Sequence, residues 1–169
     1  MTKLTIAILS LCVASSTLAG EPDDKAPALL TTKVLPLNLA MTAARAAFDA
    51  CAKHKVGVSV AIVDRSGLVK TLAKGDGAGA YTLDAARRKA YTAANIGLPT
   101  GKFEELLRAH PDVWSMRQVT DILVIGGGLP ILAGSELIGG IGVSGAPSTQ
   151  ADEECAQSGI DAIKRSLTP

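Results

Sequence analysis

Two groups of short apolar runs, each joined internally by tight turns, place the strongest constraint on how this chain folds. In the first group, VGVSVAIVD (Val56 to Asp64) is short and β-branched, and LVKTLAKG follows it after the turn residues RSG. Runs of this kind around a Gly-containing turn are typical of a β-hairpin. The second group holds three apolar runs separated by glycine-rich turns, namely Asp121 to Gly126, Leu129 to Ala133 and Glu136 to Ser144. Because strands joined by tight turns run antiparallel, the pattern predicts a five-stranded antiparallel sheet.

Helical patterns flank both groups of strands. Apolar residues recur at spacings of three and four from Leu37 to Cys51, which predicts an amphipathic helix. Helices are also expected over Thr82 to Ile96, over Lys102 to His110 and over Gln150 to Leu167. The predicted order is α-β-β-α-α-β-β-β-α, an α/β (α+β) arrangement with helices packed on the sheet.

The N-terminal part of the chain is expected to lie outside this domain. Residues 1–19 combine Lys3, an apolar run of signal-peptide length and a small-x-small site at 17–19, so they predict a cleaved signal peptide and a periplasmic or secreted protein. Residues 20–36 hold prolines and charges without a period, which predicts a flexible N-terminal arm. Residues 37–169 are then a single domain, long enough for a sizeable core.

Cysteine use fits export. Cleavage would remove Cys12 and leave Cys51 and Cys155, and an even pair in an oxidising compartment invites a disulfide. Two small buried thiols that never meet are the alternative, and the residues alone leave both open. No C-x-x-C-H motif occurs in the sequence, which excludes covalent c-type haem attachment.

Charge argues against nucleic acid as a partner. The formal net charge is +1 and no basic cluster stands out, whereas nucleic-acid-binding domains carry a concentrated basic surface.

Gly140, Gly142 and Gly145 spell G-x-G-x-x-G after an apolar run, as in dinucleotide-binding loops. Such a loop also needs a returning strand after its helix and an acidic residue about 20 positions on. No strand pattern follows the last expected helix, so we expect no nucleotide. The glycines are instead expected in close backbone packing and in the turn that starts this helix, with side-chain capping at 148–150.

No constellation of catalytic residues emerges. Val143-Ser144 is not part of a G-x-S-x-G nucleophile elbow, and His54 and His110 lie in no tight metal-binding spacing. The acidic residues that follow apolar runs are explained by turns or a helix start. The residues alone therefore indicate an exported α/β domain and no particular chemistry.

Three segments in order nevertheless resemble the GlcG/HbpS-like family of haem-binding or haem-associated proteins. They are VSVAIVDRSGLVKTLAKGDGAGA, AARRKAYTAANIGLPTGKFEELL and LVIGGGLPILAGSELIGGIGVSGAPSTQADEECAQSG. Together they cover nearly everything from Leu37 to Ile163. The GDGAG segment and the signal peptide are most similar to the exported, haem-binding branch.

This resemblance implies a compact antiparallel α/β fold and a homo-oligomer, from dimer to octamer. It implies haem as a non-covalent cofactor, used in scavenging, buffering or sensing, with a membrane sensor protein as a further partner. Relatives in glycolate- and diol-utilisation loci imply the alternative of an enzyme, or an accessory protein, acting on a small hydroxy or carbonyl metabolite. A third alternative is an assembly module whose glycines serve packing.

Five residues are candidates for the haem site through this resemblance. The iron-ligand candidates are His54, His110, Thr92 and Thr100, and Lys89 is a candidate for pairing with a propionate. The adjacent Arg88 is a further candidate for such a pair, with a solvent-facing side chain as the alternative. Each also has a structural explanation: the histidines end helices, Thr92 can pack in a core and Thr100 can cap a helix. Because hydroxyl ligation of iron is weak, we expect modest haem affinity. An aromatic content of 3% further favours a shallow or intersubunit site.

Overall fold

A computed structural model describes residues 28–168 of the chain. The chain divides into two units, residues 1–31 and residues 32–169, and every helix and strand below belongs to the second. The predicted signal peptide, and the arm up to residue 27, lie outside the described residues.

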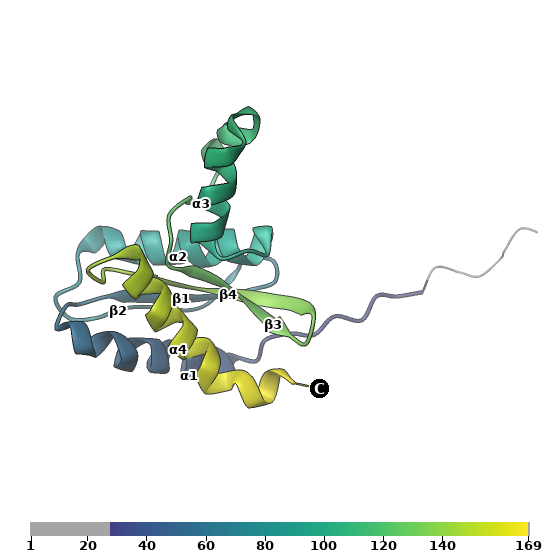
Figure 1. Cartoon of the computed structure of the whole chain (residues 1–169). Helices are drawn as coiled ribbons and strands as arrows, with labels where there is room; N and C mark the ends of the chain where they lie inside the picture. The colour runs from purple at the N-terminus through teal and green to yellow at the C-terminus, as the bar shows by residue number, and fades with distance from the viewer. Residues whose placement is uncertain (1–27, 169) are drawn as a thin grey trace, which may run out of the picture. The chain divides into compact units, whose positions relative to one another are not determined.

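Four antiparallel strands form one sheet (Figure 1). They are β1 (Ser59–Asp64), β2 (Val69–Lys74), β3 (Gly128–Ala133) and β4 (Glu136–Ser144). The order across the sheet is β2-β1-β4-β3, so β1 and β4 are central although they are far apart in sequence. The first hairpin, β1 and β2, turns at residues 65–68 as predicted.

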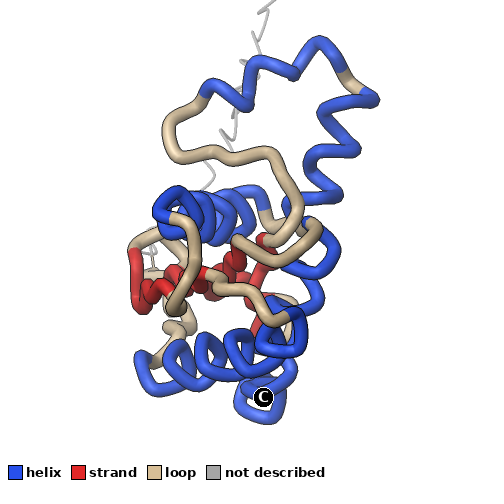
Figure 2. Tube along the Cα trace, turned by 90° about the vertical axis from the view of Figure 1, so that its left-hand side faces the viewer, coloured by secondary structure: helices blue, strands red, loops and turns tan. Residues whose placement is uncertain are grey.

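Helices cover both faces of this sheet (Figures 1 and 2). The α-helices are α1 (Leu37–Cys51), α2 (Ala80–Ile96), α3 (Thr100–Ala109) and α4 (Thr149–Leu167), and the 3-10 helices are η1 (Ala52–His54) and η2 (Pro111–Gln118). α1 and α4 pack together on one face, and α2 covers the other. α3 and η2 lie on the α2 side and extend away from the sheet (Figure 2).

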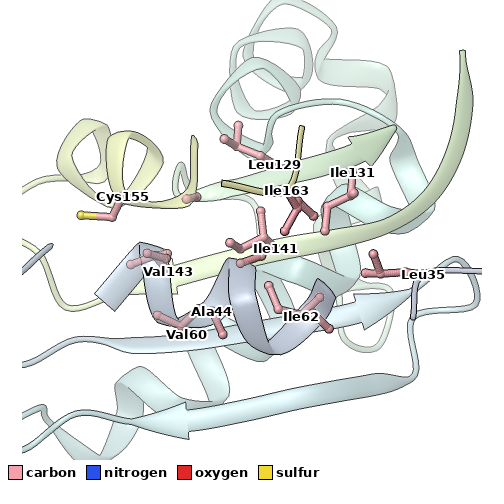
Figure 3. Close-up of a cluster of buried hydrophobic side chains, with 14 of the residues drawn as sticks. Leu35, Ala44, Val60, Ile62, Leu129, Ile131, Ile141, Val143, Cys155 and Ile163 are labelled. Atoms are coloured by element: carbon pink, nitrogen blue, oxygen red, sulfur yellow. The ribbon is translucent and has the colours of Figure 1, made fainter. Parts of the chain in front are cut away.

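The larger core lies between the sheet and the pair α1 and α4 (Figure 3). Successive strand side chains point to opposite faces, so Val60 and Ile62 enter this core while Ala61 and Val63 pack under α2. Leu35 is fully buried in the larger core. The C-terminal end of the expected arm is therefore packed on the domain, which begins ahead of Leu37.

The prediction of a fifth strand at residues 121–126 is wrong. In the structure, Leu123 donates its backbone N–H to the Thr92 hydroxyl at 2.8 Å, and the Ile122 carbonyl accepts from Arg88 at 2.8 Å. Side chains of α2 thus satisfy backbone groups that a strand would have paired with a neighbouring strand. This segment is instead a loop that runs from η2 back to the sheet (Figure 2).

The glycines of the G-x-G-x-x-G pattern serve packing and a turn, as the sequence predicted. Gly140 and Gly142 lie on β4 under α2, where an added Cβ would meet the backbone carbonyls of Ala90 and Ala86. Gly145 has a φ of +119° in the turn before α4. The Ser148 hydroxyl then caps α4 by accepting the N–H of Ala151 at 3.1 Å.

Candidate functional site

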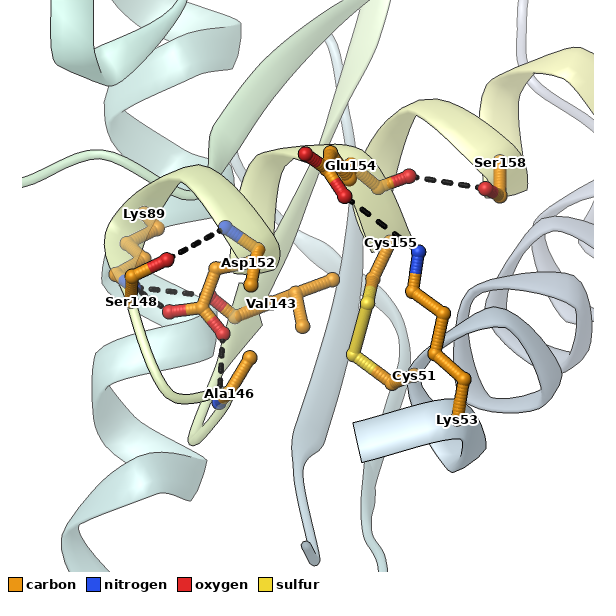
Figure 4. Close-up of a disulfide and its surroundings, with 11 residues drawn as sticks. Cys51, Lys53, Lys89, Val143, Ala146, Ser148, Asp152, Glu154, Cys155 and Ser158 are labelled. Atoms are coloured by element: carbon orange, nitrogen blue, oxygen red, sulfur yellow. Dashed lines mark hydrogen bonds and ion pairs between the residues drawn. A yellow bond between two sulfur atoms is a disulfide. The ribbon is translucent and has the colours of Figure 1, made fainter. Parts of the chain in front are cut away.

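Lys89 lies in a buried ion pair where α2 faces the start of α4 (Figure 4). Its Nζ is 2.8 Å from Asp152 Oδ2 and donates to the Val143 carbonyl at 3.0 Å, and the two side chains are 3% and 6% exposed. Asp152 also accepts the N–H of Ala146 at 2.9 Å. Burial raises the pKa of the Asp152 carboxyl, although Lys89 and this N–H both stabilise the charged form. The pair ties the middle of α2 to the β4–α4 turn.

Thr92 and Thr100 are also buried and use their hydroxyls inside the protein. The Thr92 hydroxyl donates to the Arg88 carbonyl at 2.8 Å and accepts the N–H of Leu123. The Thr100 hydroxyl accepts the N–H of Gly128 at 2.9 Å. Thr92 therefore holds the loop after η2 to α2, and Thr100 holds the start of β3 to the start of α3.

Replacing Thr92 by valine is expected to lower the free energy of unfolding by about 1–3 kcal/mol, because the Leu123 N–H loses its acceptor. Thr42→Val is a matched control. Thr42 also lies on a helix and donates to the carbonyl four residues earlier, but it is exposed and holds no other segment. This control is expected to change stability by less than about 0.5 kcal/mol. Urea unfolding measures both, and equal effects would show that the bond to Leu123 stabilises nothing.

A surface hollow of about 450 Å³ lies beside Trp114, between α2, α3, η2 and the loop that follows η2. We call it the Trp114 hollow. Apolar side chains form part of its wall, namely Trp114, Ile122, Leu123 and Val124. A neighbouring hollow of about 370 Å³ shares Trp114 and Arg108 and adds Leu107 and Pro111. The Trp114 hollow has the volume, and the mixture of apolar and polar lining, of a small-molecule site.

Charge in the Trp114 hollow is predominantly positive. The charged residues that line it are Arg88, Arg108, Arg117 and Glu104, an excess of two positive charges (+3 − 1). Arg117 lies over the Trp114 ring, 4.7 Å from its centroid, and Arg108 pairs with Glu104 at 2.7 Å. Arg88 donates from Nη2 to the Ile122 carbonyl, while its buried Nε has no partner among the described residues. The wall thus offers guanidinium donors beside an aromatic ring, which suits an apolar ligand that carries carboxylates.

Other hollows on the described residues suit such a ligand less well. One of about 330 Å³ at the starts of α3 and α4 is lined by three glutamates, Glu104, Glu105 and Glu153. Another, of about 410 Å³, lies between residues 32–35 and the hairpin turns and has no aromatic side chain in its lining.

The five residues proposed from sequence do not come together. Lys89, Thr92 and Thr100 are buried around the η2–β3 segment, and none of them lines a hollow described here. His110 is exposed at the end of α3, directly before Pro111 of the neighbouring hollow. His54 ends η1 on the opposite side of the sheet, and its Nε2 is buried without a partner among residues 28–168.

The sequence pointed to Arg88 as a propionate partner but not to Arg108 or Arg117, and it gave Trp114 no role of its own. The W-x-x-R spacing of Trp114 and Arg117 was a usable signal, because one helical turn brings such residues together. The presence of Arg88 and Arg108 in the lining of the same hollow was not readable from spacing.

Cys51 and Cys155 are joined by a disulfide in the structure (Figure 4). Their Cα atoms are 5.4 Å apart, and the bond links the end of α1 to α4 across 104 positions of the chain. Both residues are fully buried in the larger core.

Comparison with known proteins identifies the family. The sequence profile of the family described as "Haem degrading protein HbpS-like" matches residues 35–161. The chain belongs to the HbpS-like family. This agrees with the resemblance found in the sequence, and the match spans the four strands and nearly all of the four helices.

Solved structures of other proteins share this HbpS-like fold. A crystal structure of HbpS superposes with a TM-score of 0.75 at 38% identity, over 80% of this chain and 94% of the other. A crystal structure of a PduOC–haem complex superposes with a TM-score of 0.70 at 26% identity, over 78% of this chain and 96% of the other. A Citrobacter freundii protein described as an uncharacterized 15.0 kDa protein of the dhaT-dhaS intergenic region is 28% identical over 108 residues, 63% of this chain and 75% of that protein.

Two features are absent from the described part of this HbpS-like chain. None of its helices is both long and apolar enough to cross a bilayer. Within residues 28–168, no group of three or more His, Cys, Asp or Glu side chains is arranged so that it could hold a metal ion.

Proposed function

We propose that this HbpS-like protein is an exported, non-enzymatic haem-binding protein and that the Trp114 hollow holds the haem. The observation that carries the proposal is the lining of this hollow, which joins apolar and aromatic side chains to an excess of two positive charges. The family and the haem complex of a relative with the same fold support the choice of ligand.

Haem matches this lining in shape and charge. It is a flat apolar macrocycle with two propionate groups, and when bound it supplies a redox-active iron. Trp114 and the apolar residues of the loop would hold the ring. Arg88 and Arg117 would hold the propionates, because guanidinium groups bind carboxylates through charged, directional hydrogen bonds.

The haem is held non-covalently and with modest affinity in this proposal. The sequence has no attachment motif for a covalent bond, and no His, Met, Cys or Tyr lines the hollow within the described residues. Iron ligation by such side chains is what usually holds haem tightly.

The disulfide supports the proposal that the protein is exported. A buried Cys51–Cys155 bond suits an oxidising compartment, and together with the signal-like N-terminus it supports a periplasmic or secreted location. Scavenging, buffering or sensing of haem are the uses we propose there. Homo-oligomers from dimer to octamer and a membrane sensor partner stay predictions from the family resemblance.

The alternative of an enzyme for small hydroxy or carbonyl metabolites requires an ionisable group in a cavity, and Lys89 and Asp64 are the first residues to consider for that role. Lys89 is instead held by Asp152 and lines no hollow on the described residues. Asp64 lines a hollow, but its side chain accepts the N–H groups of Ser66 and Leu68 within the hairpin turn. Neither site favours catalysis.

Titration of the purified protein with hemin tests the proposal. We expect a saturable shift of the Soret band, and we expect the bound hemin to co-elute with one oligomer in size-exclusion chromatography. Arg117→Gln is expected to weaken hemin binding about tenfold, the effect of losing one charge-assisted hydrogen bond. Arg45→Gln, an exposed arginine on α1 paired with Asp49, is the matched control and should bind like the parent. A signal that never saturates would contradict haem binding.

A further inference from the structure

We propose that the Trp114 hollow recognises the ring and the carboxylate edge of a tetrapyrrole and does not require its metal. The ligand class is therefore a tetrapyrrole dicarboxylate, with or without iron. This inference rests on the proposed function and extends it from haem to metal-free porphyrin.

The first argument is what lines the hollow. Its wall supplies an aromatic ring, aliphatic side chains, guanidinium groups, the Gln118 amide and the Glu104 carboxylate, which is already paired with Arg108 at 2.7 Å. None of these coordinates haem iron, since iron in proteins takes His, Cys, Met or Tyr. Every attractive contact that this wall can make is therefore with the macrocycle or its carboxylates.

The second argument is where the iron-ligating residue types lie. Within residues 28–168 none of them lines the Trp114 hollow, and they are Met41, Cys51, His54, Tyr81, Tyr91, His110, Met116 and Cys155. Both cysteines are consumed in the disulfide, and His54 is on the other side of the sheet. His110 and Met116 flank the hollow in sequence without lining it, so His110 is the residue whose removal tests this argument most severely.

The third argument is the unused hydrogen-bonding capacity for anions. The Arg88 side chain is 33% exposed, with Nη2 donating to the Ile122 carbonyl and Nη1 lying 3.9 Å from Asp84 Oδ2. Arg117 forms no ion pair within the described chain and is held over Trp114. Arg117, with its donors unpaired among the described residues, and the exposed part of Arg88 lie on one wall and match the two carboxylates of a protoporphyrin.

Three probes separate ring, carboxylate and metal: hemin, metal-free protoporphyrin IX and protoporphyrin IX dimethyl ester. Binding is followed by Soret absorbance for hemin and by porphyrin fluorescence for the other two. We expect the dissociation constants of hemin and protoporphyrin IX to agree within about threefold, and the ester to bind at least about tenfold more weakly. Arg117→Gln should weaken both free acids about tenfold and leave the ester unchanged, whereas Arg45→Gln should alter none of the three.

His110→Ala and His54→Ala give a spectroscopic readout of the same claim. Neither substitution should move the Soret maximum of bound hemin or its dissociation constant. Saturable hemin binding without protoporphyrin IX binding, or loss of the hemin spectrum in His110→Ala, would overturn the inference while the proposed haem function stands. Equal binding of the ester and the free acid would overturn the role of the carboxylates. Failure of all three probes to saturate would instead overturn the proposed function.

Discussion

Replacing Lys89 by methionine is expected to lower the free energy of unfolding by about 3–5 kcal/mol, because the buried Asp152 carboxylate would lose its countercharge. Methionine fills a similar volume, so the loss reflects the charge rather than a cavity. For a domain of this size the thermal midpoint should fall by roughly 10–20 °C. Thermal unfolding followed by circular dichroism measures the change.

Two further variants make this result interpretable. Lys102→Met removes an equally short ion pair, to Glu105 at 2.9 Å, but both side chains are 68% exposed, and its midpoint should stay at the parent value. The double variant Lys89→Met with Asp152→Asn removes both charges and keeps an acceptor for the Ala146 N–H. It should recover much of the lost stability. A Lys89→Met midpoint equal to that of Lys102→Met would show that the buried pair does not hold α2 to the β4–α4 turn.

Removing the disulfide by the double substitution Cys51→Ala and Cys155→Ala is expected to cost about 4–5 kcal/mol. The bond closes a loop of 104 positions, and in the chain-entropy view it stabilises the fold by restricting the unfolded chain. Urea unfolding should show a lower midpoint. The dependence of the unfolding free energy on urea should also become steeper, because the unfolded chain exposes more surface.

The parent protein unfolded and refolded under reducing conditions provides the matching control. Its midpoint should coincide with that of the double alanine variant, since both lack the bond and differ by two small side chains. An alanine variant as stable as the oxidised parent would contradict a stabilising role for the bond between α1 and α4.

Much of the fold was predictable because it follows local patterns. The alternation of Val60 to Val63, the DRSG turn and the three-four spacing of α1 each act within a few residues, and the structure confirms the elements they predicted. The packing role of Gly140 and Gly142 was likewise readable, since glycines on a strand allow a helix to approach closely.

The wrong prediction of a fifth strand and the unpredicted Trp114 hollow share one physical reason. Residues 121–126 are apolar enough for a strand, yet Thr92 and Arg88, about 30 positions earlier, take up their backbone groups. The same long-range contacts create the Trp114 hollow by holding this loop beside α2. Spacing along the sequence does not report contacts of this kind, so the threonines were predicted as ligands, and of the three arginines at the hollow only Arg88 was predicted to pair with a propionate.

The central claim is that haem lies in the Trp114 hollow, and hydrogen exchange of the protein with and without saturating hemin tests it most directly. Ligand contact slows local opening, and amide exchange reports that protection segment by segment. We predict slower exchange in residues 111–125, which form η2 and the following loop, and unchanged exchange in residues 52–58 around His54. Protection around His54 with residues 111–125 unaffected would contradict this account and place the haem on the other side of the sheet.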